Sequence, residues 1–148
     1  MLFVGLTVGF IAMELLSYLI HRFLFHGLLW RIHQTHHHAH HSLFELNDVF
    51  SAGFAVIAMT LLYVGAPTLT STPWFGMGAG ITLYGLLYFW VHDVYTHKRY
   101  FRFSTKNRLI RKVKVAHQHH HQSIEKHGNE PYGLFLFPYH KYKSKQGS

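Results

Sequence analysis

The chain has 148 residues, enough for about one domain, and its apolar fraction of 49% excludes a disordered tail. Aromatic residues make up 17% and charged residues only 14%, which is typical of a protein in contact with lipid rather than of a soluble surface. The net charge of +8 suits either an anionic membrane surface or nucleic acid. Cysteine is absent, which excludes disulfides and thiolate ligands and leaves 16 histidines as the main source of metal ligands.

Three apolar stretches are long enough to cross the hydrocarbon core of a bilayer: residues 2–20, 50–66 and 74–91. The first has neither a basic leading segment nor a small-residue cleavage site, so we expect it to stay as an anchor. An uncharged segment rich in Pro, Ser and Thr connects the second and third stretches as a short turn. The pattern predicts an all-α integral membrane protein, with three to four transmembrane helices in a single membrane domain over residues 1–148.

Basic residues are concentrated at one end of the predicted spans. Arg22 and Arg31 follow the first span, and a further group of Lys and Arg lies between residues 98 and 114, after the third. Because cytoplasmic loops carry the excess of Lys and Arg, residues 21–49 and those after 91 are predicted to be cytoplasmic. All histidines then lie on that side, where we expect a cytoplasmic helical cap that carries the histidine motifs.

Capping residues predict where two of the helices begin. In the sequence SLFE, Ser42 and Glu45 match a capping box and predict that the second span begins there. Ser104 or Thr105 is the predicted N-cap of an amphipathic helix that continues to His121, with Lys and Arg on much of its surface. Nucleic acid is a competing partner for the basic face, but the preceding span favours phospholipid headgroups. We therefore expect a helix at the membrane surface with lipid as its partner, and no nucleic acid.

Histidines recur in a spacing that appears twice along the chain. HRFLFH is followed by HQTHH, and later HDVYTH is followed by HQHHH, so that Hx4H precedes HxxHH each time. On a helix HxxHH directs at least two imidazoles to one side, whereas residues five apart differ by about 140°. The two rings of Hx4H are thus predicted either to reach different metals or to lie where the helix ends or bulges. Ten imidazoles exceed the coordination of one ion and predict a dinuclear centre. Its expected ligands are His21, His26, His33, His36, His37, His92, His97, His117, His120 and His121.

The dense run at residues 33–41 also has a simpler interpretation, a flexible histidine-rich tract that binds metal weakly. For that run alone the two interpretations are equally good. The tract does not explain the histidines at the span ends or the repeated spacing, so we favour the structured site. Six histidines fall outside the repeat: no ligand role is assigned to His38, His40, His41 and His119, and His127 and His140 are expected at the surface.

Carboxylates are few near these motifs. The sequence has no ExxH, which excludes a ferritin-like dimetal arrangement. Asp93, four residues before His97, is predicted either to accept a ring N–H from it or to pair with Lys or Arg at the helix end. Glu14 within the first span should face the protein interior, either to steady the metal site or to pair with another buried polar group. Asn47 and Asp48 are candidates for similar supporting roles.

The four histidine motifs in this order, with the segments LFELNDVF and YGLLYFWVHD, closely resemble the bacterial β-carotene 3-hydroxylases of the fatty acid hydroxylase superfamily. The resemblance extends from the first span through His121. It implies that the ten motif histidines bind two non-haem irons, with zinc as an alternative metal in the purified protein. It also implies a single membrane hydroxylase domain, a monooxygenase of carotenoid biosynthesis that uses O2 to convert β-carotene through β-cryptoxanthin to zeaxanthin.

The same resemblance implies where the protein works and with which partners. It places the chain in the bacterial inner membrane, where a carotenoid enters from the bilayer. Electrons would come from a ferredoxin-type donor, because the chain has no dinucleotide-binding fingerprint of its own.

Two alternative functions remain open on the sequence. A hydroxylase, ketolase or desaturase acting on a fatty acyl chain or a sterol would use the same histidine motifs. A membrane metal-binding or transport protein would place ionisable residues at mid-membrane along a path, whereas these histidines cluster at one interface. A related question concerns the glycines at positions 53, 76, 78, 80 and 85, which either allow close helix packing or leave a slot for a rigid polyene.

Overall fold

A computed structural model of the protein describes residues 1–37 and 44–142, and every regular element in these ranges is helical. The prediction of an all-α protein is thereby confirmed. Along the chain the elements are α1 (Leu2–Leu19), the π-helix η1 (Ile20–Leu28), α2 (Trp30–His37), α3 (Asp48–Gly65), the short 3₁₀ helix η2 (Ala66–Thr68), α4 (Trp74–Tyr88), the π-helix η3 (Phe89–Thr96) and α5 (Arg108–His121).

Three helices in the described ranges are long and apolar enough to cross a membrane: Leu2–Leu28, Asp48–Thr68 and Trp74–Thr96. They correspond to the three predicted spans, and many of their large apolar side chains are exposed, as expected of a surface that faces lipid. The first and third spans extend beyond the predicted ends because π-helical segments continue them.

Both predicted helix starts are corrected by the structure. The second span begins at Asp48 rather than at the capping box, of which Ser42 lies outside the described residues. The Asp48 carboxylate accepts a hydrogen bond from the backbone N–H of Glu45 at 2.9 Å. The Glu45 side chain therefore does not act as the capping group that the sequence predicted, and it makes other contacts. The N-cap of α5 is Asn107, whose Oδ1 accepts hydrogen bonds from the second and third backbone N–H groups after it.

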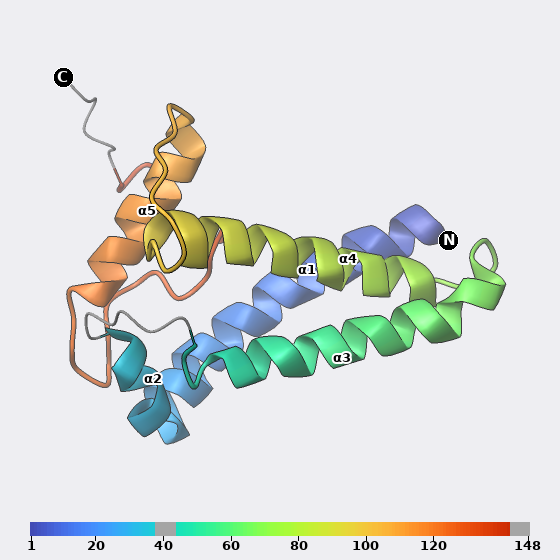
Figure 1. Ribbon diagram of the computed structural model, residues 1–148, viewed down its shortest axis with the longest axis horizontal. Helices are drawn as coiled ribbons and strands as arrows, with labels where there is room; N and C mark the ends of the chain where they lie inside the picture. Colours follow the sequence, from blue (N-terminus) through green and yellow to red (C-terminus); the bar gives the residue numbers. More distant parts are fainter. Residues whose placement is uncertain (38–43, 143–148) are drawn as a thin grey trace.

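The central helix of the bundle is α4, against which both α1 and α3 pack, while α1 and α3 hardly touch each other (Figure 1). Glycines allow the close approach of α1 and α4. A Cβ atom on Gly80 would overlap the carbonyl of Leu6, and one on Gly5 would overlap the backbone of Pro73. Gly5 and Gly9 on α1 thus face Gly76 and Gly80 on α4 in a pair of GxxxG motifs.

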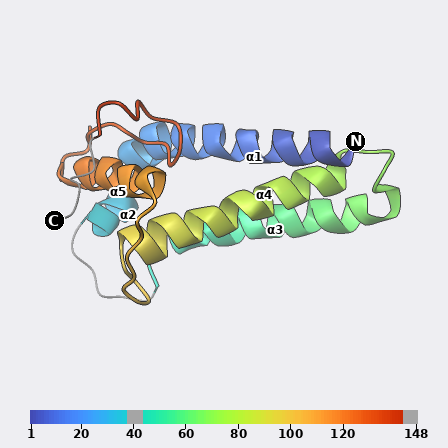
Figure 2. The ribbon, with the colours of Figure 1, turned by 90° about the horizontal axis from the view of Figure 1, so that it is seen from above.

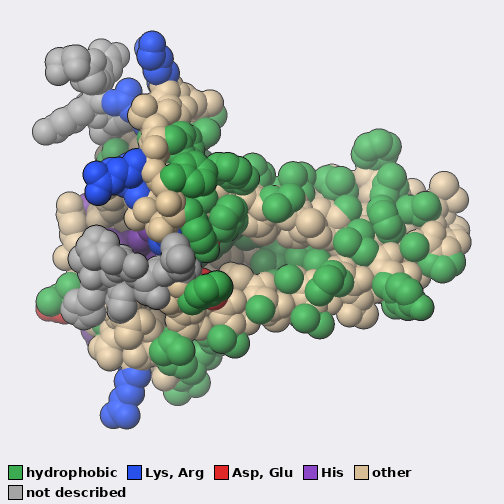
Figure 3. Space-filling view, viewed as in Figure 1, with side chains coloured by type: hydrophobic (Ala, Val, Ile, Leu, Met, Phe, Trp, Pro, Cys, Tyr) green, Lys and Arg blue, Asp and Glu red, His purple; other side chains and the backbone are tan. Residues whose placement is uncertain are grey.

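The remaining elements form a cap at one end of the bundle. In Figures 1 and 2, α2, α5 and the segment after α5 lie at the end away from the N-terminus and from the turn between α3 and α4. Figure 3 shows Lys and Arg side chains gathered at this same end, while hydrophobic side chains follow the spans. Val113 on α5 and Leu134 after it pack against Val91 of the third span, which fixes the cap to the bundle.

Candidate metal centre

The two Hx4H motifs lie on the π-helical segments that end the first and third spans. Here backbone hydrogen bonds join residues five apart, as from His97 N to His92 O at 2.9 Å. The wider turn brings residues five apart to the same side of the helix, unlike a regular α-helix. His92 and His97 accordingly lie together in one group of imidazoles, and His21 and His26 lie together in another. The helix bulges here, as one of the two alternatives expected, and each pair lies within a single group of imidazoles.

Nine of the ten motif histidines gather into two groups. In each group one nitrogen per ring lies within 4.8 Å of all the others. Because metal–nitrogen bonds are about 2 Å long, nitrogens this close can surround a single ion. The first histidine group comprises His21, His26, His33, His37 and His120. The second histidine group comprises His36, His92, His97 and His117.

The tenth motif histidine, His121, lies beside the second group. Its ring stacks on His37 with centroids 4.4 Å apart, and the centroids of His97 and His117 are 4.7 and 4.5 Å away. Its Nε2 atom is buried and has no hydrogen-bond partner among the described residues. Buried polar atoms are normally satisfied, so an unpartnered nitrogen at this position fits a metal ligand. The ligand role of all ten histidines stays a prediction.

The nitrogens that face one another are mainly Nε2 atoms. Pairs of them lie 2.8 to 3.3 Å apart: His21 with His33, His33 with His37, His26 with His120, His36 with His92, and His97 with His117. In two of these pairs, His26 with His120 and His36 with His92, the Nδ1 atoms of both rings face oxygen acceptors and therefore carry the proton. Two bare lone pairs at this separation repel each other. The donor set therefore fits a cation held between the rings.

Backbone carbonyls between α5 and residue 132 hold the first histidine group from outside. Each accepts a hydrogen bond from the Nδ1 of one ring, over distances of 2.5 to 3.0 Å. The pairs are His21 with Tyr132, His26 with Lys126, His37 with Ser123, and His120 with Asn129. Sequence reasoning missed this ring of carbonyls, because backbone groups leave no mark in a residue pattern.

Carboxylates hold the second histidine group. Glu45 Oε2 accepts from His36 Nδ1 at 2.6 Å, and Asp93 Oδ1 accepts from His92 Nδ1 at 2.8 Å. Asp93 thus orients the histidine next to it rather than His97, contrary to one predicted alternative. It also lies 3.4 Å from the guanidinium of Arg99, as the other alternative expected. Neither the role of Glu45 nor that of Arg99 is evident from the sequence, in which Glu45 matches only a capping box.

Burial keeps these imidazoles in the form that binds metals. It lowers the pKa of His120 to about 3, and it holds the pKa values of His33, His97 and His117 well below the ordinary value of histidine. Neighbouring imidazoles in each group add to the effect, because a second positive charge nearby is unfavourable. At neutral pH these rings are therefore neutral and can donate a lone pair without losing a proton.

The remaining predicted residues divide between support of the centre and support of the fold. The Asn47 amide lies 3.2 Å from His33 Nδ1, and Asp48 pairs with Arg99. Glu14 makes no contact with either histidine group. Its Oε1 accepts from the backbone N–H groups of Phe135 and Leu136, and its Oε2 accepts from the Tyr84 hydroxyl at 2.9 Å. For Glu14 the second alternative, pairing with other buried polar groups, is correct.

The histidines without a predicted ligand role lie apart from the two groups where they are described. His119, His127 and His140 are exposed. The ring of His119 points away to donate to the Glu130 carbonyl at 3.1 Å. The predictions for His38, His40 and His41 lie outside the described residues.

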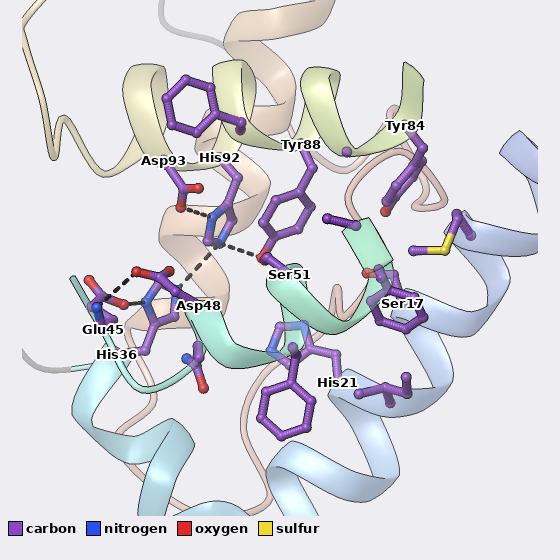
Figure 4. A pocket seen from close by; sticks show the side chains of 18 of the residues that line it. Ser17, His21, His36, Glu45, Asp48, Ser51, Tyr84, Tyr88, His92 and Asp93 are labelled. Carbon is purple, nitrogen blue, oxygen red and sulfur yellow. Dashed lines mark hydrogen bonds and ion pairs between the residues drawn. The ribbon is translucent and has the colours of Figure 1, made fainter. Parts of the chain in front are cut away.

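A cavity of about 480 Å³ leads from the membrane spans to both histidine groups. One end is formed by His21 and His33 of the first group and by His36 and His92 of the second. Figure 4 shows Tyr88 beside His92, while Tyr84 and Ser17 lie farther along, away from His36. Glu45, Asp48, Asp93 and Arg99 also line the cavity. The rest of the wall is mainly apolar, and most of its residues lie on α1, α3 and α4. Its exposed members, such as Ala55 and Leu86, show that the cavity opens between the spans.

Tyr88 is a further residue that the sequence analysis missed. Its hydroxyl lies 3.2 Å from His92 Nε2, and its ring stacks on the imidazole with centroids 4.3 Å apart. The signal was present in the sequence, because a residue four positions before a histidine lies on the same side of a helix.

Comparison with known proteins agrees with this geometry. The sequence profile of the fatty acid hydroxylase family matches residues 6–141. The chain belongs to the fatty acid hydroxylase family. Among similar proteins of this kind is the "Beta-carotene hydroxylase" of Pantoea ananas, 36% identical over 88% of this chain and 74% of its own length. The protein of the same name from Pseudescherichia vulneris is 39% identical over 84% of this chain and 70% of its length.

A plant relative extends the comparison. The "Beta-carotene 3-hydroxylase 2, chloroplastic" of Arabidopsis thaliana is 44% identical over 91% of this chain, which spans only 44% of that protein's length. No solved structure matches the chain. The family and the three apolar helices make the protein a membrane hydroxylase with histidine groups that can hold metal.

Proposed function

We propose that the protein is a β-carotene 3-hydroxylase, which uses O2 to convert β-carotene through β-cryptoxanthin to zeaxanthin. The observation that carries the proposal is the apolar cavity, which opens between membrane spans and ends at both histidine groups. A hydrocarbon dissolved in the bilayer can enter it without crossing water. Similarity to proteins named for β-carotene hydroxylation supports the choice of substrate.

We infer that each histidine group holds one iron, with His121 completing the second set. Imidazole nitrogens suit several divalent metals, including zinc, so the choice of iron rests on the family. A bound pair of irons would supply the activation of O2 and the oxidant for the substrate C–H bond.

The chain's own residues bind the substrate, orient it and exclude water. The apolar wall of the cavity surrounds the polyene and displaces water from its inner end. His21, His33, His36 and His92 border that end, so a ring carbon placed there lies next to both groups. The Tyr88 hydroxyl beside His92 restricts how far the ring can advance, which helps to select the carbon that is presented.

The setting of the reaction follows from the charge distribution. Lys and Arg gather at the end of the bundle that carries the histidines, which by the positive-inside rule is the cytoplasmic end in a bacterial inner membrane. A ferredoxin-type donor would deliver electrons from that side, and lipid headgroups would contact the basic face of α5. Residues 1–148 act as a single hydroxylase domain.

The test is expression in a bacterial host that accumulates β-carotene, with chromatography and mass analysis of the pigments. We expect zeaxanthin and β-cryptoxanthin with the wild-type chain, and unchanged β-carotene with His117→Ala. The control is His119→Ala, which changes an exposed ring outside both groups and should retain activity. Unchanged β-carotene with folded, iron-loaded wild-type protein and a supplied ferredoxin would contradict the proposal and point to an acyl lipid or sterol.

A further inference from the structure

The glycines at positions 53, 76, 78, 80 and 85 in the second and third spans fall into two classes according to what a side chain there would meet. A Cβ atom on Gly76, Gly78 or Gly80 would overlap the backbone of a neighbouring helix. A Cβ atom on Gly53 or Gly85 would meet nothing within 4 Å. The first class serves helix packing, so only the second can leave open space.

The two open glycines differ in what they face. Gly85 on α4 lines the cavity, whereas Gly53 on α3 does not. Both are exposed, so Gly85 belongs to the part of the cavity wall that reaches the lipid. A side chain at Gly85 would occupy the entrance to the cavity, and one at Gly53 would point to lipid outside it.

Short side chains from the other two spans also line this cavity. They are Ser17 of α1, and Ser51 and Ala55 of α3. In Figure 4, Ser51 lies below Tyr88 and Ser17 lies below Tyr84. All three spans therefore contribute small residues to the wall of this cavity, although α1 and α3 hardly touch each other.

We propose that Gly85 is a specificity-determining residue, which keeps the cavity entrance wide enough for a cyclic end group. The inference rests on the proposed function and names the feature of the substrate that this site selects. A trimethylated six-membered ring is wider than a straight hydrocarbon chain, so it needs more room to pass. Gly85 lies seven residues before His92, roughly 10 Å along the helix axis, so the ring passes it to reach the histidine groups.

The test compares Gly85→Leu with the matched variant Gly53→Leu. Each replaces an exposed glycine inside a spanning helix by a good helix former, so neither should disturb folding. Each protein is purified from cells that accumulate either β-carotene or lycopene, an acyclic polyene with the same number of carbons. The readouts are carotenoid retained per protein, metal bound per protein, and pigment conversion in the β-carotene cells.

We expect Gly85→Leu to lower retained β-carotene, counted together with the hydroxylated products formed from it, about tenfold, because the added volume cannot be accommodated beside the ring. Retained lycopene and bound metal should stay at the wild-type level, and Gly53→Leu should change nothing. Wild-type retention of β-carotene by Gly85→Leu, or an equal loss of both polyenes, would overturn the inference.

The same measurements separate this inference from the proposed function. If the wild-type chain retains β-carotene without hydroxylating it, the proposed reaction fails, and the retention of the two polyenes still decides the role of Gly85. If the wild-type chain neither converts β-carotene nor retains either polyene, both proposals are wrong.

Discussion

Arg99 and Asp48 form an ion pair with two parallel hydrogen bonds, Nη1 to Oδ1 at 3.0 Å and Nη2 to Oδ2 at 2.7 Å. The side chain of Arg99 is only 4% exposed, and its guanidinium also approaches Glu45 and Asp93. One cation thus lies among three carboxylates, two of which orient imidazoles of the second histidine group. The pair also joins the start of α3 to the end of the third span.

Replacing Arg99 with Met should destabilise the protein, because it leaves three carboxylates close together without a counter-charge. Breaking a buried pair from one side typically costs about 3 kcal/mol. The measurement is the thermal unfolding midpoint of the purified protein in detergent. Arg99→Lys keeps the charge but loses the two parallel hydrogen bonds, so its unfolding midpoint should fall between those of the wild type and Arg99→Met. A midpoint for Arg99→Met equal to that of the wild type would show that the cluster does not contribute.

The carboxylates behind the second histidine group should control how tightly that group holds metal. In Glu45→Gln and Asp93→Asn the acceptor charge is lost, and outer partners of this kind are worth roughly tenfold to a hundredfold in metal affinity. We expect metal content after dialysis against a weak chelator to fall from about two to about one per chain. Glu130→Gln is the control, because that carboxylate is half exposed and pairs with Arg22. Equal loss in all three variants would refute the assignment.

Glu14 should anchor the segment after α5 to the first span. Glu14→Leu leaves two backbone N–H groups and the Tyr84 hydroxyl without their acceptor, at a cost of about 2 kcal/mol or more. Glu14→Gln keeps one acceptor oxygen and should be much milder. Limited proteolysis checks the outcome, with faster cleavage after residue 130 expected for the Leu variant alone. Unchanged cleavage would mean that other contacts hold the segment.

The glycine contact between α1 and α4 should be intolerant of even one added methyl group. In Gly80→Ala the new Cβ overlaps the Leu6 carbonyl, which is backbone and cannot move aside, so we expect a loss of about 1–3 kcal/mol. Gly53→Ala meets nothing and should be neutral or slightly stabilising. Unfolding of both variants in increasing denaturant gives the comparison. Equal stability of the two would argue against close packing at this contact.

A histidine that belongs to one of the two groups should be needed for metal binding, whereas a sequence neighbour outside the groups should not. His120→Ala removes a buried ring of the first group and should lower bound metal, whereas the adjacent His119→Ala should not. Removing metal from the wild-type protein with a strong chelator should lower its unfolding midpoint, because ligand binding to the folded state stabilises it. Equal metal content in both variants would contradict the grouping.

Local patterns were sufficient to predict the three spans and to distinguish the histidines that gather into the two groups from most of the others. Apolar length predicts a span from composition alone, because the hydrocarbon core of a bilayer is typically about 30 Å thick. The i, i+3 and i, i+4 spacings of HxxHH predict shared faces of a helix, and repetition distinguished these histidines from their neighbours. Glu45 and Arg99 escaped notice because each is explained adequately by local roles, in a cap and in a basic run.

Only the tertiary structure decided how the histidines divide and what holds them. Each HxxHH motif contributes histidines to both groups. Each Hx4H motif contributes to only one group, because the π-helical turn brings its two histidines to the same side of the helix. The backbone carbonyls around the first group come from a segment that follows α5, about a hundred residues after His21 and His26. The glycines at positions 53, 76, 78, 80 and 85 look alike in sequence, yet three of them lie at helix contacts and one lines the cavity. Residues that look alike along one helix differ here in which other segments they contact, and a local sequence pattern does not contain that information.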